Sequence, residues 1–346
     1  MISNKATGAT VSSWRRYLPW LNLLLTGLLI VAGLWYLSRR ASLGAIGQAL
    51  AGASPGYVLL AVAIMVLTIA LKGWRWRLMF PTERPPIPFR AAFWATALGQ
   101  YVNLIVPFLR LGEVARLYAF NQETGAGAAR ALGTLIVEKT LDLVFFGLTV
   151  VFVLPFVILP DYVNSPGPML LILPLALLSV LYLLAFQTEF VIRIWQRLVR
   201  PLPERLARRL LPIVVSGLEG LAALRDRRLM LLMLLISLAV AVLAVALPYT
   251  LFPALGLPLT LLDAALLHIV VSIAITPPST PAKVGVFNGA VALMLWQFGL
   301  TDETAIASYA ILFYLVVILP QVFLGIVAAS RSKWRWSTAP ATPPIT

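Results

Sequence analysis

The stretch NLIVPFLRLGEVARLYAF, residues 103–120, places a proline, two arginines and a glutamate inside an otherwise apolar segment. Burying one ionised side chain in a membrane costs about 2.5–3.5 kcal/mol, so these charges need a structural or functional reason. Pro107 breaks a helix, and the part that follows, Gly112–Phe120, is only nine residues long before polar NQETGAG. A helix needs about 20 apolar residues to cross the hydrocarbon core. We therefore expect Phe89–Ala119 to form a re-entrant hairpin that begins and ends on one side of a membrane.

The composition of the whole chain supports a membrane setting. Of the 346 residues, 60% are hydrophobic and 12% are charged, whereas soluble domains are about 45–50% apolar and 25% charged. Several apolar runs approach 20 residues, and the alternating pattern of a transmembrane barrel is not visible. Cysteine is absent, which excludes disulfides and thiolate metal sites. The predicted fold class is all-α, a polytopic transmembrane helical bundle.

The positions of the basic residues predict the topology. If the N-terminus is cytoplasmic, all 27 lysines and arginines except Arg39, Arg40 and Lys283 lie on or near the cytoplasmic side, as the positive-inside rule requires. The net charge of +14 then reflects topology and attraction to anionic lipids, and no nucleic-acid partner is expected. The six expected spans are 18–37, 57–80, 141–159, 167–186, 229–252 and 305–330.

The predicted organisation is one membrane domain, 18–330, in the cell membrane with both termini in the cytoplasm. Residues 1–17 form a cytoplasmic N-terminal tail, and the proline-rich residues 331–346 form a disordered one. Within the domain, residues 189–228 alternate basic and apolar side chains at helical spacing and predict amphipathic helices on the cytoplasmic surface.

A second break, TPPSTPAKVG at residues 276–285, interrupts the apolar segment Leu261–Leu300. Its two arms form either two short spans or a hairpin that enters from the opposite face of the membrane. In each break a proline is followed by a cation and a glycine, a pattern consistent with an inverted repeat of broken helices. These residues are Pro107, Arg110 and Gly112 in the first break, and Pro281, Lys283 and Gly285 in the second.

Arg110, Glu113 and Arg116 are spaced three residues apart, so a helix that begins near Gly112 places them along one side. A guanidinium in such a row binds phosphate well, because its planar N–H groups can donate hydrogen bonds to two phosphate oxygens at once. Backbone N–H groups at the helix start favour an anion as well. The alternative is structural, with Glu113 and Arg116 only neutralising each other.

Glu138 and Asp142 are four residues apart on one helical face, with Lys139 beside them. They couple transport to a proton or cation, or they act as counter-ions for Arg110, Arg116 or Arg130. His268 has no second histidine or carboxylate at metal spacing, so neither a metal nor another cofactor is expected.

The remaining candidates lie near the two breaks and at the end of the second span. Arg75, within LKGWRWRLMF, is either an interface anchor or a headgroup contact. The full set of expected substrate contacts is Arg75, Asn103, Pro107, Arg110, Gly112, Glu113, Arg116, Thr276, Ser279, Lys283, Gly285 and Asn288.

The motifs KGWRW, NLIVPFLRLGEVARLY, EKTLDL and TPPSTPAKVGVFN, in this order, resemble the transmembrane region of lysylphosphatidylglycerol synthases and their stand-alone flippase-like relatives. The resemblance covers roughly residues 18–330. It departs from the family pattern at Lys283, where a small residue is usual, and at Asn288, where an acid is usual. The positions that match the family are Arg75, Trp76, Pro107, Gly112, Glu113, Arg116, Glu138, Lys139 and Asp142.

The resemblance implies a protein that moves lipids between membrane leaflets. In the fused synthases a soluble domain attaches lysine to phosphatidylglycerol, and the membrane part moves the product. This chain has no room for that domain, so we expect a non-enzymatic translocator of an anionic phospholipid or a polyprenyl-linked lipid. The alternatives are a membrane-embedded transferase and an accessory subunit that acts on lipid-linked sugars. Nothing in the sequence indicates an oligomeric state.

Overall fold

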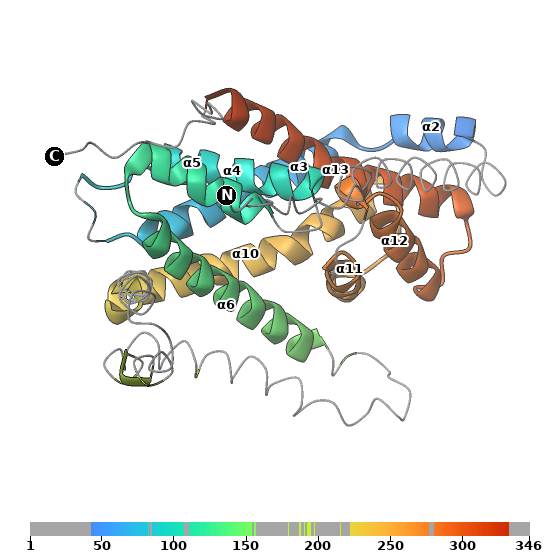
Figure 1. The fold of residues 1–346 in the computed structure, drawn as a ribbon. Helices are drawn as coiled ribbons and strands as arrows, with labels where there is room; N and C mark the ends of the chain where they lie inside the picture. The colour runs from blue at the N-terminus through green and yellow to red at the C-terminus, as the bar shows by residue number, and fades with distance from the viewer. Residues whose placement is uncertain are drawn as a thin grey trace, which may run out of the picture.

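The computed structural model describes residues 43–81, 83, 85–106, 111–153, 222–276 and 280–331, with a few isolated positions between 156 and 215. Within these residues every regular element is a helix (Figure 1), which confirms the predicted all-α class. The expected spans 18–37 and 167–186, both tails and most of the amphipathic segment 189–228 lie outside the described residues. So do three of the predicted site residues, Pro107, Arg110 and Ser279.

Three long apolar helices form the centre of the bundle: α3 (Pro55–Leu78), α10 (Arg227–Ala254) and α13 (Glu303–Arg331). The shortest has 24 residues, about 36 Å at 1.5 Å per residue, which exceeds the roughly 30 Å of a hydrocarbon core. Their bounds agree within two residues with three of the expected spans, because the length of an apolar run and its charged flanks determine where a membrane helix begins and ends.

Contacts at both ends show that α3 and α10 run antiparallel. The Ser54 N–H donates to the Ala254 carbonyl at one end, over 2.9 Å. Near the other end, Arg75 Nη1 donates to Ser237 Oγ over 2.8 Å. Helix α13 runs parallel to α3, since its last turns pack beside Ile69 while its first turns pack on the short helix α2 (Leu43–Ala51).

The first broken segment forms the hairpin that its sequence predicts. Helix α4 (Phe89–Ile105) and helix α5 (Leu111–Thr124) have 17 and 14 residues, about 25 and 21 Å, and neither reaches across a hydrocarbon core. They approach so closely that a Cβ on Gly112 would collide with the Gly99 carbonyl and the Asn103 side chain. Helix α5 continues beyond the predicted nine residues, because NQET adds another helical turn.

The second broken segment also forms a hairpin, with α11 (Leu261–Ala274), the short helix η4 (Pro281–Lys283) and α12 (Val286–Gln297). Helix α11 begins at a capping box in which the Thr260 hydroxyl and the Asp263 carboxylate each accept a backbone N–H. The arms have 14 and 12 residues, too few for two full spans. The tip contacts the middle of α13, where the Tyr314 hydroxyl donates to the Ala282 carbonyl over 3.0 Å.

The two hairpins enter the bundle from opposite ends of α3, α10 and α13 (Figure 1). The first opens near the end of α13, where the Arg331 guanidinium lies 4.7 Å from the centre of the Trp94 ring. The second opens where α13 begins, after the turn at Gly299. In each half of the chain a long helix is followed by a hairpin and a further long helix, and α10 runs opposite to α3. This connectivity is that of the predicted inverted repeat.

Helix α6 (Ala128–Val153) follows the first hairpin and corrects one prediction. It begins 13 residues before the expected span 141–159. The charged residues that seemed to precede the span are instead helical and have partners inside the bundle. Trp76 Nε1 donates to Thr134 Oγ1 over 2.9 Å, so the first turns of α6 lie beside the end of α3.

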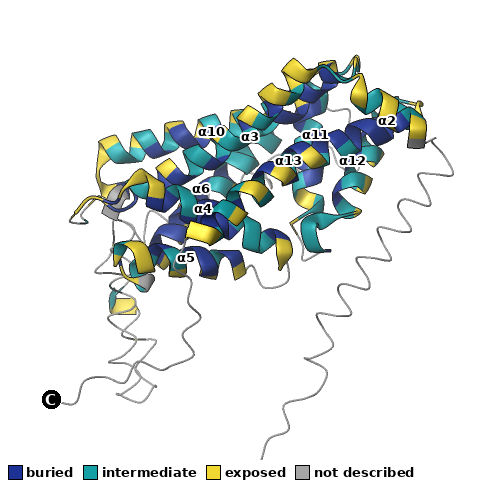
Figure 2. Cartoon of the chain, turned by 90° about the horizontal axis from the view of Figure 1, so that it is seen from above, coloured by how far each residue is buried: buried dark blue, intermediate teal, exposed yellow. Residues whose placement is uncertain are grey.

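The outer surface of the bundle is apolar. Figure 2 shows buried residues where helices face one another and exposed residues along their outer sides. Large exposed hydrophobic residues include Leu59 and Phe323, each 68% exposed. Many exposed hydrophobic side chains on long helices are typical of a surface that faces lipid.

Candidate functional site

Two adjoining cavities, of about 460 and 340 Å³, lie between the tips of the two hairpins. Many residues line both, so the cavities form one polar region inside the bundle. Each of the six elements α3, α4, α5, α6, α11 and η4 contributes a polar or charged side chain to it. These residues are Lys72, Asn103, Glu113, Lys139, Asp142, His268 and Lys283.

The structure brings many of the residues that the sequence singled out to this region. Those that line at least one cavity are Asn103, Glu113, Arg116, Glu138, Asp142, Thr276 and Lys283. Four others line neither cavity: Arg75, Gly112, Gly285 and Asn288. Gly112 instead allows the close packing of α4 on α5, and Gly285 caps α12 with a φ of 83° that favours glycine.

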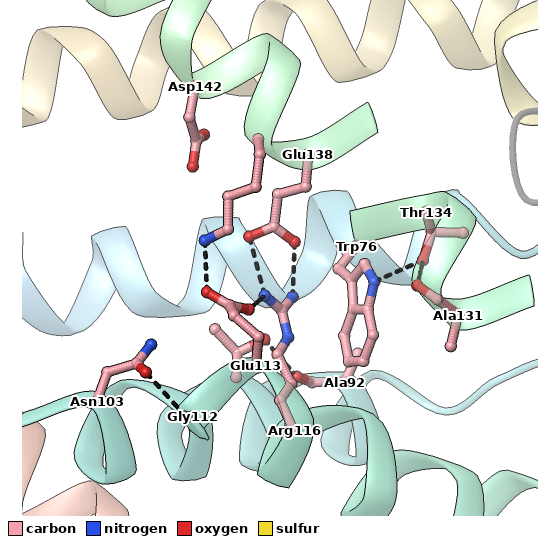
Figure 3. A network of polar contacts seen from close by, with 12 residues as sticks. Trp76, Ala92, Asn103, Gly112, Glu113, Arg116, Ala131, Thr134, Glu138 and Asp142 are labelled. Atoms are coloured by element: carbon pink, nitrogen blue, oxygen red, sulfur yellow. Dashed lines mark hydrogen bonds and ion pairs between the residues drawn. The ribbon is translucent and has the colours of Figure 1, made fainter. Parts of the chain in front are cut away.

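Arg116 forms a two-pronged ion pair with Glu138 (Figure 3). Nη1 lies 2.9 Å from Oε1 and Nη2 lies 2.8 Å from Oε2, and the residues are 3% and 2% exposed. The guanidinium carbon also lies 3.8 Å from the centre of the Trp76 ring, close enough for a cation–π interaction. Both terminal nitrogens of Arg116 therefore face a carboxylate, and a phosphate would have to displace Glu138 to reach them.

Arg75 is fully buried and joins three helices. Nη2 lies 2.5 Å from Asp142 Oδ1 on α6, and Nη1 donates to Ser237 on α10. This position differs from the interface anchor that the sequence also allowed, because α6 covers the end of α3. Arg75 thus lies behind the wall of the cavity, where it neutralises an acid that lines the cavity.

A third ion pair joins α5 to α6. Lys139 Nζ lies 2.7 Å from Glu113 Oε1, and the lysine side chain is 46% exposed. Glu113 also lies 4.0 Å from Arg116. Helix α6 therefore pairs with α5 through Glu138 and Lys139 and with α3 through Asp142.

A hydrogen bond joins the two arms of the first hairpin near its tip. Asn103 Oδ1 accepts the Gly112 N–H over 2.9 Å, so one backbone donor at the start of α5 is occupied (Figure 3). The sequence had suggested that this donor was available to an anion. The side-chain amide of Asn103 still lines both cavities.

Positive charge exceeds negative charge around the cavities within the described residues. All three acids there pair with a cation, and a lysine from α3 and another from η4 also line the cavities. The cations are Lys72, Arg75, Arg116, Lys139 and Lys283, and the acids are Glu113, Glu138 and Asp142. The formal excess is two positive charges.

The expected substrate contacts did not include Lys72, His268 or Ser272, which line both cavities. Lys72 precedes Arg75 by three residues, so the two residues lie on the same side of α3. His268 was considered only as a metal ligand, although His268 and Ser272 on α11 and Thr276 just after its end recur every four residues and form one polar stripe. Among the described residues, no group of three histidines or acids is arranged to bind a metal ion.

Comparison with known proteins identifies a family whose sequence pattern this chain matches. Residues 23–325 match a family model described as the lysylphosphatidylglycerol synthase TM region. A UPF0104 membrane protein from Methanothermobacter thermautotrophicus is 25% identical over 286 residues, which cover 77% of this chain and 82% of that protein. A UPF0104 membrane protein from Methanocaldococcus jannaschii is 27% identical over 140 residues, 40% of this chain and 42% of that protein. The family match includes both hairpins and every cavity residue named above.

Proposed function

Because the chain belongs to the lysylphosphatidylglycerol synthase transmembrane-region family, we propose that it binds the headgroup of an anionic lipid in its central cavity and moves that lipid between leaflets. The lipid is an anionic phospholipid or a polyprenyl-linked phosphate. The membrane is the cell membrane, with the basic ends of α3 and α13 toward the cytoplasm, in keeping with the positive-inside rule.

The observation that carries this proposal is the excess of two positive charges around a cavity inside an apolar bundle. Charge at this depth is costly, and every acid in the region is already paired. A phosphate group would reduce the excess. A cationic ligand would increase it.

The opposed hairpins supply a route to both leaflets. Broken helices that meet near the centre of a bundle from opposite sides are a common device of transporters, because each can open the central site toward its own face. The larger cavity also has an apolar wall, formed by Phe145 and Phe146 of α6 and Val240 of α10. This wall suits the glycerol and first methylenes of a lipid.

The paired acids argue against catalysis at the same site. A transferase that acts on a lipid-linked sugar needs a carboxylate that binds a metal or takes a proton. In the cavity, Glu113, Glu138 and Asp142 each face a lysine or arginine. We therefore assign Glu138 and Asp142 the role of counter-ions.

The test is transport in proteoliposomes. The protein is reconstituted with a trace of phosphatidylglycerol or phosphatidylcholine that carries a headgroup-distal fluorophore, and dithionite then bleaches the outer leaflet. We expect the protein to increase the bleached fraction of phosphatidylglycerol beyond that in protein-free vesicles, and to do so more than for phosphatidylcholine. Equal bleaching of both lipids with and without protein would contradict the proposal.

A further inference from the structure

The cavity has a side that donates hydrogen bonds, separate from its ion pairs. The ion pairs lie between α5, α6 and α3, where Arg75, Arg116 and Lys139 are engaged by acids. The other side is formed by Lys72 of α3 and by the polar stripe of α11. Because the arginines are occupied, a ligand that enters the cavity meets the second side without breaking an existing ion pair.

Three side chains on this second side have hydrogen-bond donors that no described residue accepts. None of the described acids pairs with Lys72, which carries three N–H donors and lies within electrostatic range of His268. The His268 ring and the Ser272 hydroxyl line both cavities and form no hydrogen bond to any described residue. Thr276 differs, since its hydroxyl already donates to the Ser272 carbonyl over 2.6 Å.

The tip of the second hairpin places a further lysine at this side. Ala282 and Lys283 have φ values of 54° and 60°, a left-handed conformation that residues other than glycine rarely adopt. The hydrogen bond from Tyr314 to the Ala282 carbonyl and the one from Thr280 Oγ1 to the Val284 carbonyl fix this strained turn. Lys283 lines both cavities as a result. Strain of this kind is often found where a side chain is placed for function.

We propose that the phosphate of the bound lipid lies between Lys72, His268, Ser272 and Lys283, and that Arg116 and Arg75 stay in their ion pairs. The group of donors matches a phosphate, which offers only acceptor oxygens to a protein. This inference rests on the proposed function, since it locates the headgroup within the same cavity.

Binding of phosphatidylglycerol to the purified protein tests the site. The protein in detergent is titrated with dioleoyl phosphatidylglycerol, and native mass spectrometry measures the fraction that retains lipid. Lys72→Gln removes the charge while keeping a similar length, and Lys72→Arg keeps the charge. Arg90→Gln is the matched control, because Arg90 is exposed at the start of α4 and lines neither cavity.

We expect Lys72→Gln to weaken retention about tenfold, the size of one lost charge-assisted hydrogen bond. Ser272→Ala should weaken it less, and Lys72→Arg and Arg90→Gln should retain lipid like the parent protein. A Lys72→Gln protein that is folded and retains lipid like the parent would overturn this site while leaving the proposed function intact. A parent protein that retains phosphatidylglycerol no better than phosphatidylcholine would overturn both.

A second experiment distinguishes whether the site binds a lipid headgroup or free phosphate. Inorganic phosphate is added at concentrations up to a hundred times that of the lipid, and retention of lipid is measured again. We expect little displacement, because the apolar wall beside the site adds contacts that free phosphate lacks. Displacement by an equal concentration of phosphate would assign the site to free phosphate and contradict the lipid assignment.

Discussion

Arg116 of α5 and Glu138 of α6 face each other through two parallel contacts, Nη1 to Oε1 at 2.9 Å and Nη2 to Oε2 at 2.8 Å. Both terminal nitrogens of the guanidinium lie within ion-pair distance of the carboxylate, and Nη1 donates a hydrogen bond to it. The sequence presented Arg116 as a binding residue or as the partner of an acid, either Glu113 or the counter-ions Glu138 and Asp142. The nearest of these acids is Glu138, which lies on a different helix. The pair therefore connects the first hairpin to α6, beside the cavity and not across it.

Removing either member of this pair should destabilise the bundle. Arg116→Gln and Glu138→Gln each leave a buried charge without its main partner, which costs about 3–5 kcal/mol in free energy of unfolding. The double variant should cost clearly less than the sum of the two. Unfolding in mixed micelles with increasing sodium dodecyl sulfate measures these values. Additive effects of the single changes would show that the two residues do not interact.

Gly112 should tolerate no larger side chain. Gly112→Ala adds a methyl group that collides with the Gly99 carbonyl and Asn103, so we expect a loss of about 1–3 kcal/mol in unfolding free energy. Gly289→Ala is the matched control, because a Cβ there meets nothing within 4 Å. The control should be neutral or stabilising by up to about 1 kcal/mol, since alanine favours helix. Equal stability of the two variants would contradict the close packing of α4 on α5.

The two hairpins should open on opposite sides of the membrane. The chain has no cysteine, so single cysteines report position cleanly. Gln122 is exposed near the end of α5, and Thr301 is exposed between α12 and α13. A membrane-impermeant maleimide should label Thr301→Cys from outside intact cells and Gln122→Cys only after permeabilisation, as the positive-inside rule implies. Labelling of both from one side would contradict opposed hairpins.

Much of the fold follows from local features of the sequence. The long helices α3, α10 and α13 lie within two residues of their expected bounds, because an apolar run and its charged ends are sufficient to define a span. The hairpins follow from prolines and glycines that interrupt apolar segments too short to cross twice. The start of α6 does not follow, because Glu138, Lys139 and Asp142 are compatible with a buried helix only when partners from α3 and α5 are present.

The sequence predicts which residues line the cavity better than it predicts which of them form ion pairs with one another. Asn103, Glu113 and Lys283 line the cavity because each lies at or near a helix break, which the sequence reveals. The pair of Arg75 with Asp142 joins residues 67 positions apart, and only the packing of α6 on α3 brings them together. Lys72 was not among the predicted contacts, because a lysine is typical both of the end of a membrane helix and of the wall of a cavity that binds an anion.

The central claim is that the cavity between the hairpin tips binds the headgroup of an anionic lipid. A high-resolution structure of the protein in a nanodisc of phosphatidylglycerol tests it most directly. We predict density for a phosphate within hydrogen-bonding distance of Lys72, with Arg116 still paired to Glu138. Lipid headgroups found only on the outer surface of the bundle, with the cavity filled by water alone, would contradict the account.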